Sequence, residues 1–321
     1  MTQISIIIGP PGTGKTETLS TWAARGVARY GSDRVMVCSL TRAGAKEAAR
    51  RIELPPQQMG TVHAFAYRAL GEPIVAESKV KEWNEAYPDF ALSSHSATPD
   101  DAYGTHDNLT TADTSKLEVS RLRTLGRDPL LAQHSAVSGF HVRWEDWKRQ
   151  TGYLDFVDMV DHALHDVERA PGDPAVIIND ESQDTGPAEM RLLFKWADAA
   201  DHLVLAGDPQ QSLFSFRGSD PILLQTLHQK HDPDRPPLPQ SYRLSRAVYD
   251  CAYEWAGQFE QTQRVAFAPR DAQGTVEEAS FGFDQFTEES VEELVHQYGE
   301  GDGSGAVPLM FLTSCGFMLD P

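Results

Sequence analysis

The chain carries the sequence Gly9-Pro10-Pro11-Gly12-Thr13-Gly14-Lys15-Thr16 close to its N-terminus. This stretch fits the pattern G-x-x-x-x-G-K-[ST], in which a glycine-rich turn wraps around the phosphates of a nucleotide. The apolar residues 5–8 before it predict a buried strand, and residues 17–29 after it predict a helix with an apolar face. The strand–loop–helix order that the pattern requires is therefore present.

The residue types of this loop match the needs of a triphosphate. Gly12 and Gly14, on either side of Thr13, let backbone N–H groups turn toward phosphate oxygens, and the helix N-terminus adds a favourable dipole. Lys15 supplies a positive charge for the β- and γ-phosphates, and the Thr16 hydroxyl suits a Mg²⁺ ligand. We predict a nucleoside triphosphate site here; the alternative is a glycine-rich turn that binds nothing.

A pair of carboxylates follows a second apolar run. Residues 175–179 predict a buried strand, and Asp180 and Glu181 come directly after it. In such an arrangement one carboxylate holds Mg²⁺ through water, and the next accepts a proton from the attacking water. We predict Asp180 as the metal carboxylate and Glu181 as the general base. Because strand ends are commonly acidic, the alternative is a strand end without a catalytic role.

The order of the remaining elements predicts the architecture. Apolar strands at 35–39 and 202–206 alternate with helices at 43–52, 63–70 and 187–196, which indicates a parallel sheet covered on both faces. The polar residues 71–139, with helical candidates at 78–86 and 115–125, predict a small helical insertion. We expect the α/β domain to comprise residues 1–70 and 140–236, and a further region to comprise 237–321.

Two tryptophans, Trp144 and Trp147, lie three residues apart on a probable helix over residues 140–150. Such a stripe either packs the insertion onto the main domain or stacks on DNA bases. We favour packing, because an aromatic stripe at helical spacing is the ordinary signature of a buried helix face.

Composition and charge restrict the class of partner. The 321 residues carry a formal net charge of −19, and residues 257–321 hold over half of that excess. Such a charge opposes long-range attraction to DNA but permits a local basic groove. Three separated cysteines predict neither a disulfide framework nor a zinc site, which fits a reducing cytoplasm. No stretch approaches the roughly 20 apolar residues that cross a bilayer, so we expect no membrane partner.

A polar segment after residues 202–206 completes the pattern. Residues 207–218 match G-D-x-x-Q-S-x-x-x-F-R-G, and residues 180–184 read D-E-x-Q-D. Together with the glycine-rich loop, these resemble motifs III, II and I of the superfamily 1 DNA helicases of the UvrD, PcrA and Rep type. Further segments are similar to motifs Ia, Ib, the D-F-x-D segment and motif IV, in the family's order: residues 39–47, 60–65, 153–158 and 238–243.

The resemblance implies a RecA-like P-loop NTPase fold, with residues 237–321 as the incomplete start of a second RecA-like domain. In that region we expect helices at 245–259 and 288–297 and strands at 274–281 and 307–313. It implies an ATP- and Mg²⁺-dependent motor that moves 3′→5′ on single-stranded DNA or at a junction of single and double strands. In that family, Gln183 and Gln211 would sense the γ-phosphate, Tyr242 would stack near the adenine, and Arg243 would reach the γ-phosphate as an arginine finger. The DNA contacts would come from Thr41, Arg42, Thr61, His63, Phe216 and Arg217.

Several features depart from the family's pattern. Eight residues precede Gly9, whereas the family's adenine-reading glutamine lies upstream of motif I, and Leu40 replaces a frequent aromatic. The sequence ends at Pro321, before motifs V and VI. We therefore expect a fragment or a truncated form that binds ATP–Mg²⁺ weakly, hydrolyses it slowly and unwinds nothing alone, unless a partner protein supplies the missing motifs.

Three hypotheses remain. The first is the motor, of bacterial or viral origin and cytoplasmic. The second is an ATP-binding module that binds DNA or a partner with little or no turnover. The third is an unrelated small-molecule kinase, which residues 207–218 disfavour because a kinase has no use for a glutamine followed by an aromatic–arginine pair. Phe216 is predicted to stack on a base, and the alternative is a core aromatic.

Overall fold

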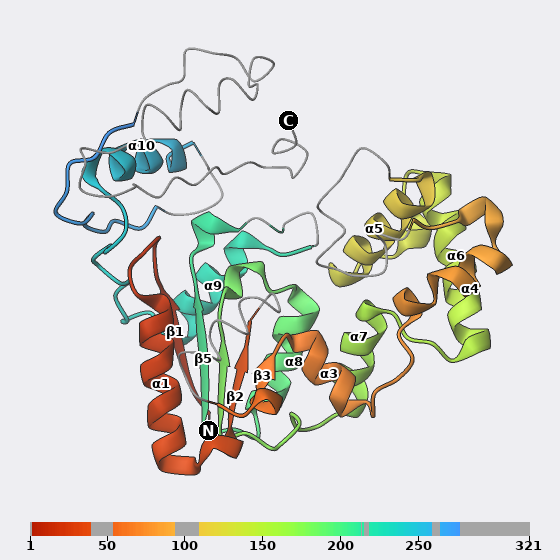
Figure 1. Cartoon of the computed structure of the whole chain (residues 1–321), viewed down its shortest axis with the longest axis horizontal. Coiled ribbons are helices and arrows are strands. Elements are labelled where there is room, and N and C mark those ends of the chain that lie inside the picture. Colours follow the sequence, from red (N-terminus) through yellow and green to blue (C-terminus); the bar gives the residue numbers. More distant parts are fainter. Residues whose placement is uncertain are drawn as a thin grey trace, which may run out of the picture.

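The structure, a computed structural model, describes residues 2–39, 54–93, 109–212, 214, 218–258 and 264–276. Within these residues, a five-stranded sheet forms the centre of the fold (Figure 1). All neighbouring strands pair in parallel, in the order β1-β5-β4-β2-β3. The strands are β1 (Gln3–Ile8), β2 (Val35–Cys38), β3 (Met59–Gly60), β4 (Val176–Asn179) and β5 (His202–Gly207). This confirms the predicted α/β class with a parallel sheet.

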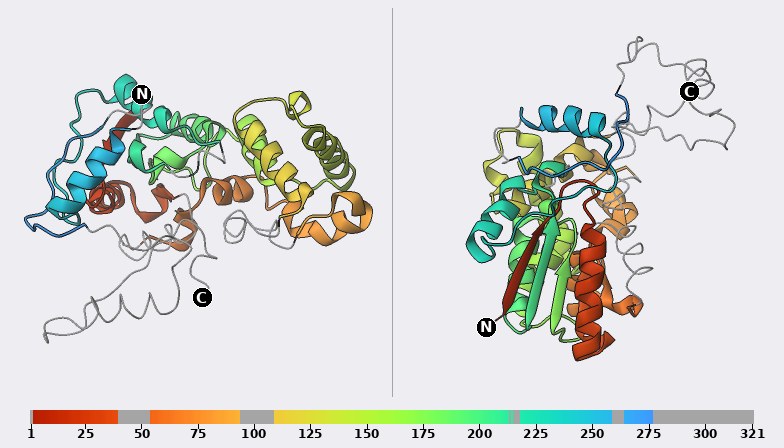
Figure 2. Two further views of the ribbon diagram at one scale, coloured as in Figure 1. Left: turned by 90° about the horizontal axis from the view of Figure 1, so that it is seen from above. Right: turned by 90° about the vertical axis from the view of Figure 1, so that its left-hand side faces the viewer.

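Successive strand residues point to opposite faces, and both faces are buried. Ile6, Met36 and Ile177 enter one hydrophobic core, whereas Ile7, Val35 and Val176 enter a second one. The second core is completed by α1 (Lys15–Tyr30). The first is completed by α3 (Val62–Ala69), α7 (Phe156–Asp166), α8 (Pro187–Ala197) and α9 (Pro221–His231). Figure 2 shows α1 on one side of the strands and α8 and α9 on the other.

The parallel arrangement brings the carboxyl ends of all the strands to one edge of the sheet, where α/β proteins place their ligands. The glycine-rich loop leaves β1 at this edge, and Thr61 follows β3 there. Asp180 and Asp208 follow β4 and β5, whose ladders run side by side. Residues far apart in the sequence are thereby collected around the loop.

The insertion forms a helical unit with a core of its own, to one side of the sheet (Figure 1). Trp83, Phe140, Trp144 and Trp147 are buried in that core, and their rings lie 5.0–5.7 Å apart in edge-on and stacked pairs. The helices of the unit are α4 (Val80–Ala86), α5 (Thr111–Thr124) and α6 (Ser135–Thr151). The burial of Trp144 and Trp147 agrees with a packing role, although they pack within the insertion itself. Helix α6 begins before residue 140 and continues through the boundary expected there.

Several expected elements lie outside the described residues: the helix at 43–52, the helix at 288–297 and the strand at 307–313. The helix expected after motif IV is present as α10 (Arg246–Ala256). Of the strand expected at 274–281, residues 274–276 are in no strand, and the others lie outside the described residues. Among the described helices, none has the length and apolar character needed to cross a membrane.

Candidate nucleotide-binding site

The glycine-rich loop has two positions that require glycine. Gly12 and Gly14 have φ angles of 71° and 85°, in the left-handed region that other residues rarely adopt. A Cβ at Gly12 would also lie 2.3 Å from the Cβ of Arg243. Within the loop, the Thr13 hydroxyl donates a hydrogen bond to the Pro10 carbonyl oxygen at 2.7 Å. The loop is therefore a tight turn whose apex has no room for a side chain.

Lys15 is the first residue of α1, and its side chain folds back along the loop. Its Nζ donates to the Gly9 carbonyl oxygen at 2.7 Å. Thr16 follows in the first turn of the same helix, whose N-cap is Gly14. The ammonium group and the positive end of the helix dipole thus meet at the mouth of the loop, which is the arrangement that attracts a phosphate group.

Asp180 and Glu181 leave the carboxyl end of β4 beside this loop. The Asp180 N–H donates to the Cys38 carbonyl oxygen at 2.9 Å, which fixes the aspartate next to β2. Burial, together with the charge of Glu181, raises the pKa of Asp180 to about 6. A divalent cation would relieve both effects, because it stabilises the ionised carboxylate. The Asp180 carboxylate and the Thr16 hydroxyl are hard oxygen ligands of the type that Mg²⁺ prefers.

Glu181 is held in an unfavourable backbone conformation. Its φ of 51° lies in the left-handed region, where a non-glycine residue costs on the order of 1–3 kcal/mol. Its Oε2 accepts a hydrogen bond from Gln183 Nε2 at 2.9 Å. Strain of this kind persists only where neighbouring groups fix the residue. Here the Gln183 amide fixes the carboxylate predicted to act as the base.

The two glutamines predicted to sense the γ-phosphate both contact carboxylates. Gln183 is buried, and its Nε2 also donates to Asp184 Oδ2 at 3.2 Å. The Gln183 Oε1 accepts the backbone N–H of Asp208 at 3.0 Å, so the side chain joins residues 180–184 to residues 207–218. Gln211 Nε2 donates to Asp208 Oδ2 at 2.6 Å. Both amide hydrogens of Gln183 are therefore in use.

Asp208 is a buried member of the site for which the sequence alone predicts no role. Burial raises the pKa of this carboxyl above its usual value. Hydrogen bonds from Gln211 and from the Gln210 backbone, together with the charge of Lys15, only partly oppose that increase. Its position directly after β5 matches that of Asp180 directly after β4. An aspartate directly after a buried parallel strand is the feature of the sequence that could have identified Asp208 as a site residue.

Ser212 and Phe214 are hydrogen-bonded to Asp184, which lies in the same segment as Asp180 and Glu181. The Asp184 Oδ1 accepts the Ser212 hydroxyl at 3.1 Å and the backbone N–H of Phe214 at 3.2 Å. Phe216 and Arg217, the predicted base-stacking residue and its neighbour, lie outside the described residues. Thr41 and Arg42, two of the expected contacts to the DNA backbone, lie outside them as well.

The other two expected DNA contacts, Thr61 and His63, are at the start of α3. The Thr61 hydroxyl oxygen caps the helix by accepting the Ala64 N–H at 3.1 Å. His63 Nδ1 lies 3.0 Å from Glu189 Oε1, and its ring lies edge-on to Phe156. Both residues thus have local structural partners, at the same edge of the sheet as the glycine-rich loop.

Tyr242 and Arg243 lie directly beside the loop. The Tyr242 N–H donates to the Gly12 carbonyl oxygen at 2.9 Å, and the Tyr242 side chain is 74% exposed. Arg243 is exposed as well, with its Cβ against the loop apex. The structure therefore brings together the loop, the acidic pair, both glutamines, Tyr242 and Arg243.

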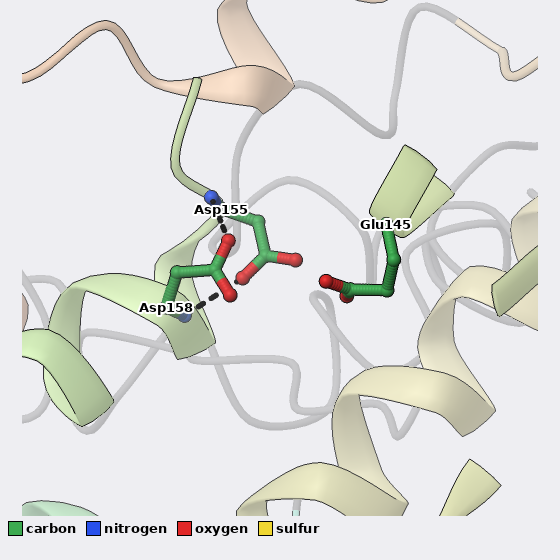
Figure 3. A group of neighbouring side chains, drawn as sticks. All are labelled: Glu145, Asp155 and Asp158. Carbon is green, nitrogen blue, oxygen red and sulfur yellow. Dashed lines mark hydrogen bonds between the residues drawn. The ribbon is translucent and has the colours of Figure 1, made fainter. Parts of the chain in front are cut away.

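A second group of acidic side chains, Glu145, Asp155 and Asp158, lies close together between α6 and α7 (Figure 3). Two basic side chains pair with these three carboxylates. Lys148 Nζ lies 2.9 Å from Glu145, 2.6 Å from Asp155 and 2.5 Å from Asp158. Arg123, on α5, lies 2.6 Å from Asp158 and 3.0 Å from Asp155. This group is therefore an ion-pair cluster, which gives Asp155 and Asp158, the two aspartates of the D-F-x-D segment, a structural role.

Comparison with known proteins points to one family. The model of the UvrD/REP helicase N-terminal domain matches residues 1–232. The ATP-dependent DNA helicase UvrD2 of Mycobacterium tuberculosis is 24% identical over 285 residues, which cover 77% of this chain and 40% of that protein. The probable DNA helicase II homolog of Mycoplasma pneumoniae is 25% identical over 255 residues, covering 70% and 35%. RecBCD enzyme subunit RecB of Mycolicibacterium smegmatis is 30% identical over 112 residues, covering 32% and 10%. The chain thus spans less than half the length of these relatives.

Proposed function

Because the chain belongs to the UvrD/REP helicase N-terminal domain family, we propose that it binds ATP with Mg²⁺ and couples hydrolysis to movement along single-stranded DNA. The 3′→5′ direction is part of the proposal and rests on resemblance alone. The observation that carries the proposal is a convergence at one edge of the sheet: the glycine-rich loop with Lys15 lies there with Asp180 and Asp208, two carboxyls whose pKa values burial raises. A cation and two such carboxyls at a glycine-rich loop suit a magnesium–triphosphate complex.

The side chains divide the chemistry of hydrolysis among them. Lys15 and the N–H groups of Gly12, Thr13 and Gly14 would bind the phosphates, and Thr16 and Asp180 would hold Mg²⁺. When bound, Mg²⁺ neutralises charge on the phosphate oxygens. Glu181 would accept the proton of the attacking water.

Three further side chains would act on the nucleotide itself. Gln211 would exchange its bond to Asp208 for one to the γ-phosphate, and Arg243 would stabilise the charge on the transferred group. Tyr242, exposed beside the loop, would stack near the adenine. The resemblance also assigns γ-phosphate sensing to Gln183, but the contacts of its amide support a different role, in which it holds Glu181 in place.

The DNA contacts belong to the same proposal. Phe216 would stack on a base, an interaction worth roughly 1–3 kcal/mol without sequence preference. Arg217, Thr41, Arg42, Thr61 and His63 would contact the strand around it. The bonds from Ser212 and Phe214 to Asp184 support a mechanical link, because they attach the start of this segment to the strand end that carries Glu181.

We also propose the domain arrangement expected from the sequence: 1–70 with 140–236, an insertion at 71–139, and the start of a second motor domain at 237–321. A separate core supports a helical insertion, although that core continues past residue 139 through α6. One relative is by name a subunit of the RecBCD enzyme. A partner chain that contributes to this site is therefore a further part of the proposal.

The rate of ATP hydrolysis, measured with and without an oligo(dT) strand, tests the proposal. We expect the strand to stimulate the rate, and Glu181→Gln to lower it by about a hundredfold or more while MgATP still binds. Lys15→Ala should abolish binding as well. DNA binding without turnover by the unaltered chain would instead favour the ATP-binding module, and turnover that ignores DNA would contradict both.

A further inference from the structure

A short segment after α9, residues 238–244, is bonded to the end of β1 and to the glycine-rich loop. The Leu238 N–H donates to the Ile8 carbonyl oxygen, and the Tyr242 N–H donates to the Gly12 carbonyl oxygen, each at 2.9 Å. Between them, the Ser241 hydroxyl donates to the Pro11 carbonyl oxygen at 2.8 Å. The end of β1 and two neighbouring residues of the loop, Pro11 and Gly12, are thereby bonded to this segment.

Ser241 makes the only one of these three contacts that uses a side chain, and that side chain is fully buried, with 0% exposed. Its oxygen also accepts the backbone N–H groups of Arg243 at 3.3 Å and Leu244 at 3.1 Å. A hydroxyl has one hydrogen to donate and two lone pairs to accept with. All three are in use, so Ser241 has no capacity left for a phosphate and acts through its neighbours.

The neighbour of Ser241 that the proposed ATP site uses is Arg243. Its Cβ lies so close to the loop apex that a Cβ at Gly12 would approach it to 2.3 Å. The Ser241 hydroxyl binds the N–H of Arg243 on one side and the Pro11 carbonyl of the loop on the other. The point at which the arginine side chain begins is therefore fixed relative to the loop, while Arg243 itself remains exposed.

We propose that Ser241 is a positioning residue that fixes Arg243 against the loop, so that the guanidinium reaches the terminal phosphate and the protein prefers ATP to ADP. This inference rests on the proposed ATP site and deepens it. ADP lacks the group that Arg243 would contact, so loss of the positioning weakens ATP binding selectively. A purely structural serine would weaken both nucleotides together, because its only effect would be on the stability of the loop.

The test is calorimetric titration of the whole chain with MgADP and with Mg²⁺ and the non-hydrolysable analogue AMP-PNP. We expect Ser241→Ala to reduce the preference for AMP-PNP over ADP by about tenfold, the usual size of one hydrogen bond to a charged group. Arg243→Ala should give a similar reduction, and the double variant should show little further loss, because both changes remove one interaction. Ser241→Thr, which retains the hydroxyl, should preserve the preference.

A matched control is Ser245→Ala, which removes another buried serine hydroxyl from the same stretch of chain. It should leave the preference unchanged, and thermal unfolding of every variant shows whether each is folded. An unchanged preference in Ser241→Ala, or full additivity with Arg243→Ala, overturns the inference while leaving the ATP site intact. Absence of nucleotide binding by the unaltered chain overturns the proposed function, and the inference with it.

Discussion

Gln183 contacts acidic residues from two strand ends, Glu181 and Asp184 after β4 and Asp208 after β5. Its amide hydrogens reach Glu181 and Asp184, and its carbonyl accepts the N–H of Asp208. A Cβ at Gly207 would lie 2.3 Å from that carbonyl oxygen, so the neighbouring strand end leaves no space for another side chain. The glutamine therefore sets the position of Glu181, whose own backbone conformation is strained.

We predict that Gln183→Ala lowers the turnover number for ATP roughly tenfold to a hundredfold, as loss of a supporting hydrogen bond commonly does. Nucleotide affinity should change little, because Lys15 and the loop remain. Steady-state kinetics and a binding titration separate the two quantities. Gln210→Ala is the matched control, since Gln210 Nε2 has no hydrogen-bond partner among the described residues. An equal loss in the control, or a loss of affinity alone, would argue against this role.

At the residue scale, the sequence predicted what depends on local spacing. Lys15, Asp180 and Glu181 could be placed because a loop or a strand end immediately adjoins them. The bond of Ser241 to Pro11 could not be predicted, because it joins residues 230 positions apart in the chain. The bond from the Asp208 N–H to Gln183 was equally inaccessible, since it depends on β4 and β5 lying side by side.

The principal connection between elements is the ion-pair cluster that joins α5, α6 and α7. Asp155 caps α7, accepts the Trp144 indole N–H at 2.9 Å and pairs with Lys148 and Arg123. Burial disfavours the charged carboxylate, but the two cations outweigh this and hold the pKa of Asp155 well below its usual value. The cluster thus fastens the insertion to the helix that covers the sheet.

We predict that Asp155→Asn lowers the free energy of unfolding by roughly 3–5 kcal/mol near neutral pH, because it removes the buried carboxylate that pairs with both Lys148 and Arg123. A lowered pKa gives stability that is present above the unfolded-state value of about 3.9 and is lost as the pH falls from there through the folded-state value. The gap between wild type and variant should therefore be constant down to about pH 5 and shrink below about pH 4. Urea unfolding followed by tryptophan fluorescence measures it.

Asp146→Asn is the control, because Asp146 forms an exposed pair with Arg149 on α6. Exposed pairs contribute about 1 kcal/mol or less, so this change should have a small effect at every pH. Equal losses of unfolding free energy in the two variants would show that the buried cluster does not hold α5, α6 and α7 together.

At the scale of elements, sequence-based prediction succeeds where apolar periodicity is strong and omits two helices. Helix α7 begins with a reciprocal capping box between Asp155 and Asp158. Helix α9 begins with Asp220 as its cap, followed by a proline. Both signals are visible in the sequence, but the first coincides with the D-F-x-D segment and was explained by that resemblance alone. The strand β3 has two residues, too few to produce an alternating pattern.

At the scale of the whole molecule, the nucleotide site and the insertion approach each other at the end of α5. Thr124, at the end of α5, lies where a Cβ on Gly186 would approach its methyl carbon to 2.9 Å, and a Cβ on Gly218 would approach it to 3.2 Å. Gly186 follows the segment that carries Glu181, and Gly218 ends the segment that begins at Gly207. A shift of either segment on nucleotide binding would therefore press on the insertion, since packed interiors transmit displacement.

The central claim is that one site recognises the terminal phosphate and that its state is transmitted to the DNA. The most direct test is the affinity of the chain for a labelled oligo(dT) strand, measured by anisotropy without nucleotide, with MgADP and with Mg–AMP-PNP. We predict that the affinity differs by about fivefold or more between the ADP and AMP-PNP states. We also predict that Gln211→Ala removes the difference. Equal DNA affinity in all three states, with both nucleotides shown to bind, would contradict the claim.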